Sequence, residues 1–230
     1  MIQTLLIAML FVLVASNAVA QDNLLSNSNL NSELAPWTAT LSGAPDPVGS
    51  GSITWAGLIN SDNVMNGSGS AQVALSAPST TTPANASSGF RQCVALPDPL
   101  FPAAPTHVTS ANYGAHFLIP ATGNASDGLA NATIEVRFFS DGNCSAFIPG
   151  AGGTQGMVLT SLALNDIVWY ELEESNLSMP SGAVTASSAE VRAFLRTTGT
   201  TSNRYIAYFD RIFLAINGGL PVELVRFSVD

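Results

Sequence analysis

The side chains that could do chemistry in this sequence are charged and aromatic residues that alternate with apolar or small ones. Glu135, Arg137 and Phe139 occupy every second position of one segment. Aromatic rings and planar polar groups are what a protein needs to hold the apolar face and the hydroxyls of a sugar ring. The candidate residues for binding a ligand are His116, Glu135, Arg137, Phe139, Arg192, Phe194 and Arg196, with Trp55 as a separate candidate at a loop tip.

The same residues also have a purely structural interpretation. Glu135 can pair with Arg137 on its own strand or with Arg192 on another, and opposite charges that face one another stabilise a sheet. Phe139 and Phe194 can pack beneath a loop. The sequence leaves both interpretations open.

Sequence patterns of common catalytic sites are missing. There is no G-x-S-x-G and no H-E-x-x-H, and His107 and His116 are the only histidines. Glycoside cleavage needs two carboxyl groups on opposite sides of the scissile bond. The acids Glu171, Glu173 and Glu174 share one short segment, where an exposed acidic rim is the simpler interpretation. We therefore expect a protein that is not an enzyme.

Positioning the candidate side chains requires β-strands, because alternate residues of a strand point to opposite faces. Segments with this alternation recur between turn signals, without a convincing helical pattern. The predicted strands cover residues 52–55, 71–75, 90–96, 113–119, 132–139, 168–172, 190–196 and 205–216, and the predicted loops include 123–128 and 149–156. This pattern predicts an all-β fold with antiparallel strands, a sandwich or a barrel.

Three of these strands have one face that is entirely apolar and another that is mixed. The predicted core residues are Ile134, Val136, Phe138, Val191, Ala193, Leu195, Tyr113, Ala115, Phe117 and Ile119. The candidate ligand-binding residues lie on the opposite, mixed faces of the same strands. One dry and one partly wet face favour the antiparallel β-sandwich.

The charge of the chain excludes two classes of partner. Its net charge is −9, its isoelectric point is near 4.4, and all seven basic residues are arginine. Nucleic acids and anionic lipid surfaces both select basic proteins. We expect neither as a partner.

The first residues indicate export. An apolar run at residues 5–15 is followed by Ala18-Val19-Ala20, and the run is too short to cross a bilayer core of ~30 Å as a helix. We expect a signal peptide at residues 1–20, a secreted protein in the extracellular or periplasmic space, and no membrane span. For the remaining residues we expect one β-sandwich domain at 21–216 and a tail or closing strand at 217–230.

Cys93 and Cys144 are the only cysteines. In an oxidising compartment an isolated pair is most simply one disulfide. A metal site or a catalytic thiol is the alternative, although neither histidine lies near either cysteine in the sequence.

Seven short motifs resemble, in the same order, the CenC-type carbohydrate-binding modules of families four and nine, which are galactose-binding-like jelly rolls. These motifs are residues 23–30 followed by Trp37, then 67–73, 90–97, 113–117, Trp169, 186–194 and 208–212. The variant with this cysteine pair is similar to exported proteobacterial proteins of unassigned role. The resemblance implies a jelly-roll sandwich that binds a glycan without catalysis. The alternative is a structural or adhesive surface protein with no small ligand.

The resemblance also implies a structural calcium ion between the opening motif and the last strand. Asp210 is present, but Asn29 and Asn31 stand where the family has acids. Calcium prefers several oxygen ligands, carboxylates among them. The residues that could hold it are Asn27, Asn29, Asn31 and Asp210, and the alternative is that Asp210 only accepts hydrogen bonds from backbone donors.

Overall fold

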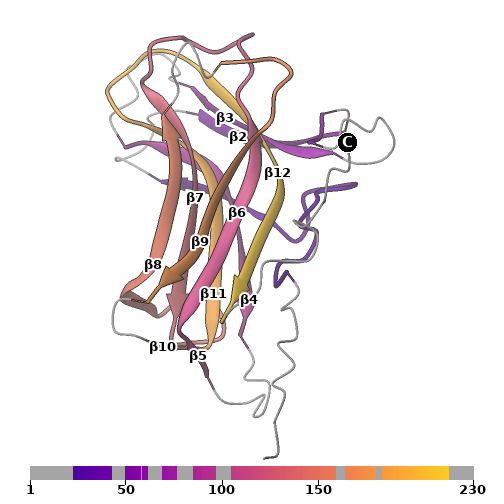
Figure 1. Cartoon of the computed structure of the whole chain (residues 1–230). Coiled ribbons are helices and arrows are strands. Elements are labelled where there is room, and N and C mark those ends of the chain that lie inside the picture. The colour runs from indigo at the N-terminus through magenta and orange to yellow at the C-terminus, as the bar shows by residue number, and fades with distance from the viewer. Residues whose placement is uncertain are drawn as a thin grey trace, which may run out of the picture.

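Two five-stranded antiparallel sheets pack face to face in the computed structural model (Figure 1), which describes residues 23–42, 50–57, 59–61, 69–76, 85–96, 105–158, 164–179 and 183–217. Sheet A has the order β1 (Thr38–Ser42), β4 (Ser87–Ala95), β11 (Ser188–Thr197), β7 (Ala130–Phe139) and β8 (Phe147–Val158). Sheet B has the order β2 (Ser50–Ala56), β3 (Ser70–Ser76), β12 (Tyr205–Ile216), β6 (Ser110–Leu118) and β9 (Tyr170–Ser178). A short pair, β5 (Thr106–Val108) and β10 (Val184–Ala186), lies across one end (Figure 1).

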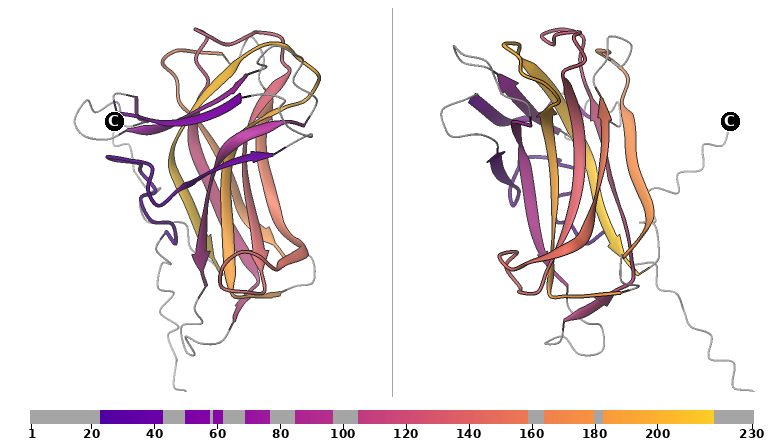
Figure 2. Two further views of the ribbon diagram at one scale, coloured as in Figure 1. Left: turned by 180° about the vertical axis from the view of Figure 1, so that it is seen from behind. Right: turned by 90° about the vertical axis from the view of Figure 1, so that its left-hand side faces the viewer.

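The chain passes repeatedly from one sheet to the other. It leaves β3 of sheet B for β4 of sheet A, returns to β6, and crosses again to β7. The crossings from β8 to β9 and from β11 to β12 continue this pattern (Figure 2). Apart from the consecutive pairs β2–β3 and β7–β8, neighbouring strands are therefore not consecutive in the sequence. This is the jelly-roll form of the antiparallel β-sandwich. The predicted all-β sandwich is confirmed.

The predicted apolar faces fill the space between the sheets. All ten predicted core residues are fully buried: Ile134, Val136, Phe138, Val191, Ala193, Leu195, Tyr113, Ala115, Phe117 and Ile119. Phe90 joins sheet A to sheet B by an edge-to-face contact with Phe209, whose ring centroid lies 5.9 Å away. Burial of this apolar surface is the main force that holds the two sheets together.

One predicted loop is a strand. Residues 149–156, which contain four glycines and a proline, lie within β8 and pair with β7 along most of its length. β8 is the last strand of sheet A, and an edge strand tolerates Pro and Gly because one of its sides needs no ladder hydrogen bonds. The loop at residues 123–128 is confirmed as irregular structure.

The opening segment makes side-chain hydrogen bonds to strands of the sandwich. Asn23 Oδ1 accepts from the backbone N of Leu214, and Asn23 Nδ2 donates to the backbone O of Ile212. Gln92 on β4 binds the backbone N and O of Ser26 at 2.7 and 2.8 Å. Two residues of the sequence motifs, Asn23 and Gln92, therefore attach the opening segment to both sheets.

A buried tyrosine ties the start of β12 to a neighbouring loop. Tyr205 donates a hydrogen bond to Asp127 Oδ2 at 2.7 Å, and its hydroxyl also contacts Thr201 Oγ1. Burial raises the pKa of Tyr205 to about 12. Burial opposes ionisation of Asp127, but hydrogen bonds, first of all from Tyr205, outweigh it and lower the pKa of Asp127 below its ordinary value of 3.8.

Substituting Tyr205→Phe should lower the free energy of unfolding by about 1 kcal/mol at pH 7, because Asp127 is exposed enough to regain water. The lowered pKa of Asp127 gives stability that is present above pH 3.8 and is lost as the pH falls through the folded-state pKa. Urea unfolding at pH 7 and pH 3 measures this. A difference between wild type and Tyr205→Phe that stays constant with pH would refute the pairing with ionised Asp127.

Two predictions about the ends of the chain fall outside the described residues. These are the signal peptide at residues 1–20 and nearly all of the tail at residues 217–230. Among the described residues, no helix has the length and hydropathy that a membrane crossing requires.

Candidate functional site

Five charged side chains form a continuous ladder across the outer face of sheet A. From β4 through β11 to β7 the ladder consists of Arg91, Glu190, Arg192, Glu135 and Arg137. Arg91 Nη1 donates to Glu190 Oε2 at 2.8 Å, and Arg192 Nη1 donates to Glu135 Oε2 at 3.1 Å. Arg137 Nη2 lies 3.0 Å from the Glu135 carboxylate, and Arg192 Nε lies 3.8 Å from Glu190 Oε1. Positive and negative groups thus alternate without a break.

Strand register produces this alternation. Arg192 on β11 lies opposite Arg91 on β4 and Glu135 on β7, while Glu190 lies opposite Arg137. Each glutamate therefore has arginines beside it and diagonally across from it. Opposite charges at these separations stabilise a sheet.

The interior of the ladder is buried and its two ends are exposed. The side chains of Glu190 and Arg192 are 4% and 9% exposed, and that of Glu135 is 17% exposed. The end arginines, Arg91 and Arg137, are 49% and 38% exposed. The ladder therefore presents mainly guanidinium groups to solvent.

Aromatic rings support the guanidinium groups. The Arg192 guanidinium lies 5.2 Å from the ring centroid of Phe194, and that of Arg137 lies 5.8 Å from the ring of Phe147. Phe147 also makes an edge-to-face contact with Phe139 and is itself 49% exposed. Rings hold a cation through the negative charge of their faces. Phe147 has surface left for a ligand.

Two clefts lie beside the ends of the ladder. One, of about 330 Å³, is lined by Arg91 and Glu190 together with Thr38 and the cysteine pair. The other, of about 310 Å³, is lined by Glu135, Arg137, Phe147 and glycines of β8. Both volumes are at the lower end of the range for small-ligand sites. Each cleft combines one exposed guanidinium with one carboxylate.

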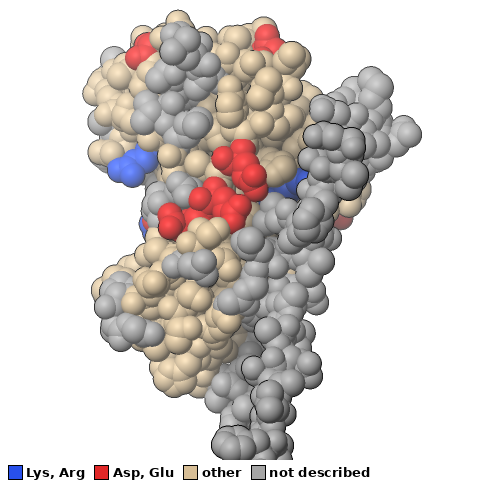
Figure 3. Space-filling model, viewed as in Figure 1, with Lys and Arg blue, Asp and Glu red and all other residues tan. Residues whose placement is uncertain are grey.

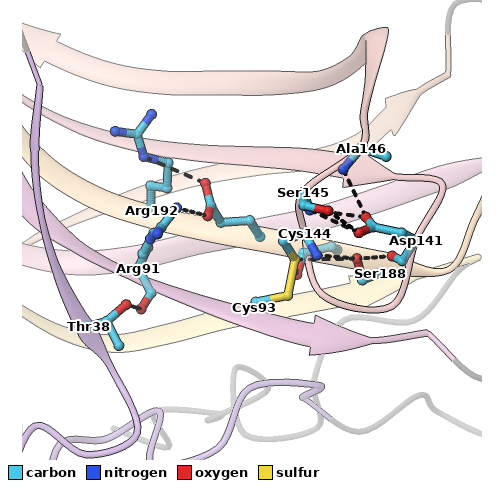
Figure 4. Close-up of a disulfide and its surroundings, with 11 residues drawn as sticks. Thr38, Arg91, Cys93, Asp141, Cys144, Ser145, Ala146, Ser188 and Arg192 are labelled. Carbon is cyan, nitrogen blue, oxygen red and sulfur yellow. Dashed lines mark hydrogen bonds and ion pairs between the residues drawn. A yellow bond between two sulfur atoms is a disulfide. The ribbon is translucent and has the colours of Figure 1, made fainter.

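The disulfide between Cys93 and Cys144 is confirmed (Figure 4). It forms a border of the first cleft. Cys93 is on β4 and Cys144 is in the loop between β7 and β8, so the bridge passes over β11. Ser188 on β11 accepts from the backbone N of Cys144 and donates to the backbone O of Asp141. Hydrogen bonds from the Ser145 hydroxyl and the Ala146 backbone lower the pKa of Asp141, which stays ionised within the loop.

The structure brings most of the predicted ligand-binding residues onto one surface. Glu135, Arg137, Phe139, Arg192, Phe194 and Arg196 all lie on β7 and β11 of sheet A. Phe139 and Phe194 are buried, as their packing interpretation expects. Arg196 is exposed beyond the ladder and donates to Asn85 Oδ1.

His116 does not belong to this surface, and its placement beside the arginines was wrong. It lies on β6 of sheet B, opposite Asp210 on β12 and Glu171 on β9. Alternation within a strand predicts which residues share a face, but it does not predict to which sheet a strand belongs.

Trp55 lies on β2 of sheet B, apart from the ladder and beside the opening segment. Its Nε1 donates to the backbone O of Leu30 at 2.8 Å. The indole lies against Gly57 and Gly69, where a Cβ would come within 2.4 and 2.3 Å of ring atoms. The ring is 40% exposed, so Trp55 stays a candidate for a separate contact.

Three residues of this surface were not predicted from the sequence: Arg91, Glu190 and Phe147. Glu190 lies two positions before Arg192, which is a signal that both share a face. Arg91 becomes relevant only because β4 pairs with β11. Phe147 begins β8, a strand that the sequence did not indicate.

The predicted calcium ligands fit that ion poorly in this arrangement. Asp210 Oδ2 accepts hydrogen bonds from the backbone and hydroxyl of Ser61, and Oδ1 accepts from the backbone N of Arg211. Burial raises the pKa of Asp210, although these hydrogen bonds oppose the shift. Asn27, Asn29 and Asn31 add no carboxylate. Within the described ranges no three His, Cys, Asp or Glu side chains form a cluster for a metal. The calcium site stays a prediction, which thermal melting with calcium or chelator would test.

No protein-family model matches the chain, and no curated protein matches it. Several solved structures have a similar arrangement of strands. The carbohydrate-binding module CBM61 in complex with β-1,4-galactotriose has a TM-score of 0.44 at 14% identity, with 85% of this chain and 99% of that chain covered. The CBM22-1 xylan-binding domain of Paenibacillus barcinonensis Xyn10C has a TM-score of 0.45 at 14% identity, with 87% and 98% covered.

The enzymatically active domain of tailspike protein 4 of bacteriophage CBA120 is also similar, with a TM-score of 0.47 at 15% identity, covering 85% of this chain and 21% of that one. Likenesses at this level say nothing about what this chain binds. The resemblance to CenC-type modules seen in the sequence motifs is not established by them.

Proposed function

We propose that this protein is a secreted, non-catalytic binding module that holds a glycan on the outer face of sheet A. The observation that carries the proposal is the cleft where the exposed Phe147 ring meets Glu135 and Arg137. An aromatic ring can stack on the apolar face of a sugar, while carboxylate and guanidinium groups bind its hydroxyls.

The second cleft supports the same proposal. It places Arg91, Glu190 and Thr38 around a hollow beside the disulfide. Because both clefts open on the same sheet face, one extended chain of sugars could contact both. Extended binding surfaces gain affinity when separate contacts are linked in one ligand.

The full chain should migrate more slowly through native gels that contain a polysaccharide it binds. A panel of neutral and acidic plant, algal and bacterial polysaccharides tests the proposal.

Substituting Phe147→Ala should weaken binding about fivefold, the equivalent of about 1 kcal/mol of ring contact.

Ile167→Ala is the matched control for that substitution. Ile167 is also an exposed apolar side chain, but it lies in the loop before β9 of sheet B. The Ile167→Ala variant should bind the polysaccharide with the same affinity as wild type. If no polysaccharide in the panel retards wild type, the glycan proposal fails.

A structural or adhesive surface protein without a small ligand is the second candidate. The observation that favours it is that every charged residue of the ladder already has an ion-pair partner within the sheet. Under this alternative Phe147→Ala changes no interaction with any glycan, so the same gels separate the two roles.

Export is part of the proposal and has its own test. Expression in a bacterium that has a secretion pathway should release a mature chain into the periplasm or medium. N-terminal sequencing should find Gln21 as its first residue, because residues 18–20 form the cleavage motif. A chain retained in the cytoplasm with residues 1–20 intact would refute it.

A further inference from the structure

The two sheets carry opposite charge. The strands of sheet A contain four arginines and two glutamates, whereas those of sheet B contain one arginine and four acids. Acidic residues gather on the face formed by β6 and β9 (Figure 3), and β9 contributes Glu171, Glu173 and Glu174. More than half of the seven basic residues of a chain with net charge −9 thus lie in sheet A.

Because of burial, the difference in charge between the two sheets is larger at the surface than the residue counts indicate. The two acids of sheet A are the more buried partners of its exposed ion pairs: Glu190 is 4% exposed beside Arg91 at 49%, and Glu135 is 17% exposed beside Arg137 at 38%. A solvated ligand therefore meets guanidinium groups first. Arg192, although buried, keeps an Nε–H with no hydrogen-bond acceptor among the described residues.

Each cleft contains one of these exposed arginines. Arg91 lines the cleft beside the disulfide and Arg137 lines the cleft beside Phe147. β11 separates their strands, adjacent strands are about 4.8 Å apart, and Arg137 lies two residues along β7 from the position level with Arg91. The backbones of the two arginines are therefore about 12 Å apart. A chain of several sugars is long enough to contact both arginines at once.

We propose that sheet A selects anionic glycans, with acidic groups on separate sugars of one chain pairing with Arg91 and Arg137. This inference rests on the proposed function and narrows it to polysaccharides that carry carboxylate or sulfate groups. A planar guanidinium binds either group through two parallel hydrogen bonds, which a neutral hydroxyl cannot match.

Matched polymers test the inference by calorimetric titration of the full chain. Polygalacturonate is compared with its fully methyl-esterified form, which has the same backbone without free carboxylates. Dextran sulfate is compared with dextran, so that sulfate and carboxylate are distinguished. Affinity for at least one anionic polymer should exceed that for its neutral counterpart about tenfold, the value of one charge-assisted hydrogen bond.

Substitution shows whether the two arginines are responsible. Arg91→Gln with Arg137→Gln should weaken binding of the anionic polymer about a hundredfold. Arg204→Gln is the control, because it removes one exposed positive charge outside the strands and should leave affinity unchanged. Thermal melts confirm that each variant is folded.

The results distinguish failure of the anionic-glycan inference from failure of the proposed function. Equal affinity for neutral and anionic polymers would overturn the anionic selectivity and leave glycan binding intact. Binding of anionic polymers that the double substitution does not weaken would also overturn the inference. Absence of binding to every polymer, neutral or charged, would overturn both the inference and the proposed function.

Discussion

Replacing both cysteines in the double variant Cys93→Ala/Cys144→Ala should lower the free energy of unfolding by about 4 kcal/mol. The bridge joins residues 51 positions apart, and closing a loop of this length restricts the unfolded chain strongly. A single domain is stable by only about 5–15 kcal/mol, so the loss is a large share of the total. Urea unfolding followed by circular dichroism measures it.

The folded structure should survive this change, because Ser188 still bonds to the loop that holds Cys144 and Asp141. Wild type unfolded with a reducing agent is the control and should match the double variant. A loss below about 1 kcal/mol would contradict the expectation and mean that the unfolded chain is compact without the bridge.

Substituting Arg192→Met should lower the free energy of unfolding by about 3 kcal/mol. Arg192 is buried at the centre of the ladder and holds Glu135 at 3.1 Å. Removing it leaves Glu190, which is also buried, with Arg91 as its ladder partner. Glu190 and Glu135 then each keep one partner, an exposed arginine. A shielded carboxylate that loses one of its two counter-charges is destabilised, because little water can reach it to replace that charge.

Arg137→Met is the matched control. It removes the same chemical group from the same ladder, but at its exposed end, where Glu135 keeps Arg192. Exposed pairs contribute between about 0 and 1 kcal/mol, so this variant should be close to wild type in stability. If Arg192→Met and Arg137→Met lower the free energy of unfolding equally, burial does not determine how much each arginine of the ladder contributes to stability.

The local pattern of the sequence was enough to predict the sandwich and the faces of its strands. Val136 and Val191 are buried and Glu135 and Arg192 face outward because side chains alternate along a strand. This alternation does not depend on which strands pair with it. The pattern could not place β11 between β4 and β7, since these neighbours are distant in sequence and their pairing follows from the crossings of the chain.

This missing register explains the errors at the candidate site. Arg91 was overlooked and His116 was included because both decisions required knowing which strands share a sheet. Phe147 was overlooked for another reason: β8 contains Pro149 and several glycines, which favour a turn unless an edge position makes a strand acceptable.

Glycan binding on the outer face of sheet A is tested most directly by NMR of the 15N-labelled full chain, titrated with a pectin digest of neutral and acidic oligosaccharides. The largest chemical-shift changes should fall on β4, β11 and β7 around Arg91, Glu190 and Arg137, with little change on β6 and β9. Changes centred on β6 and β9, or none at millimolar sugar, would contradict a glycan site on sheet A.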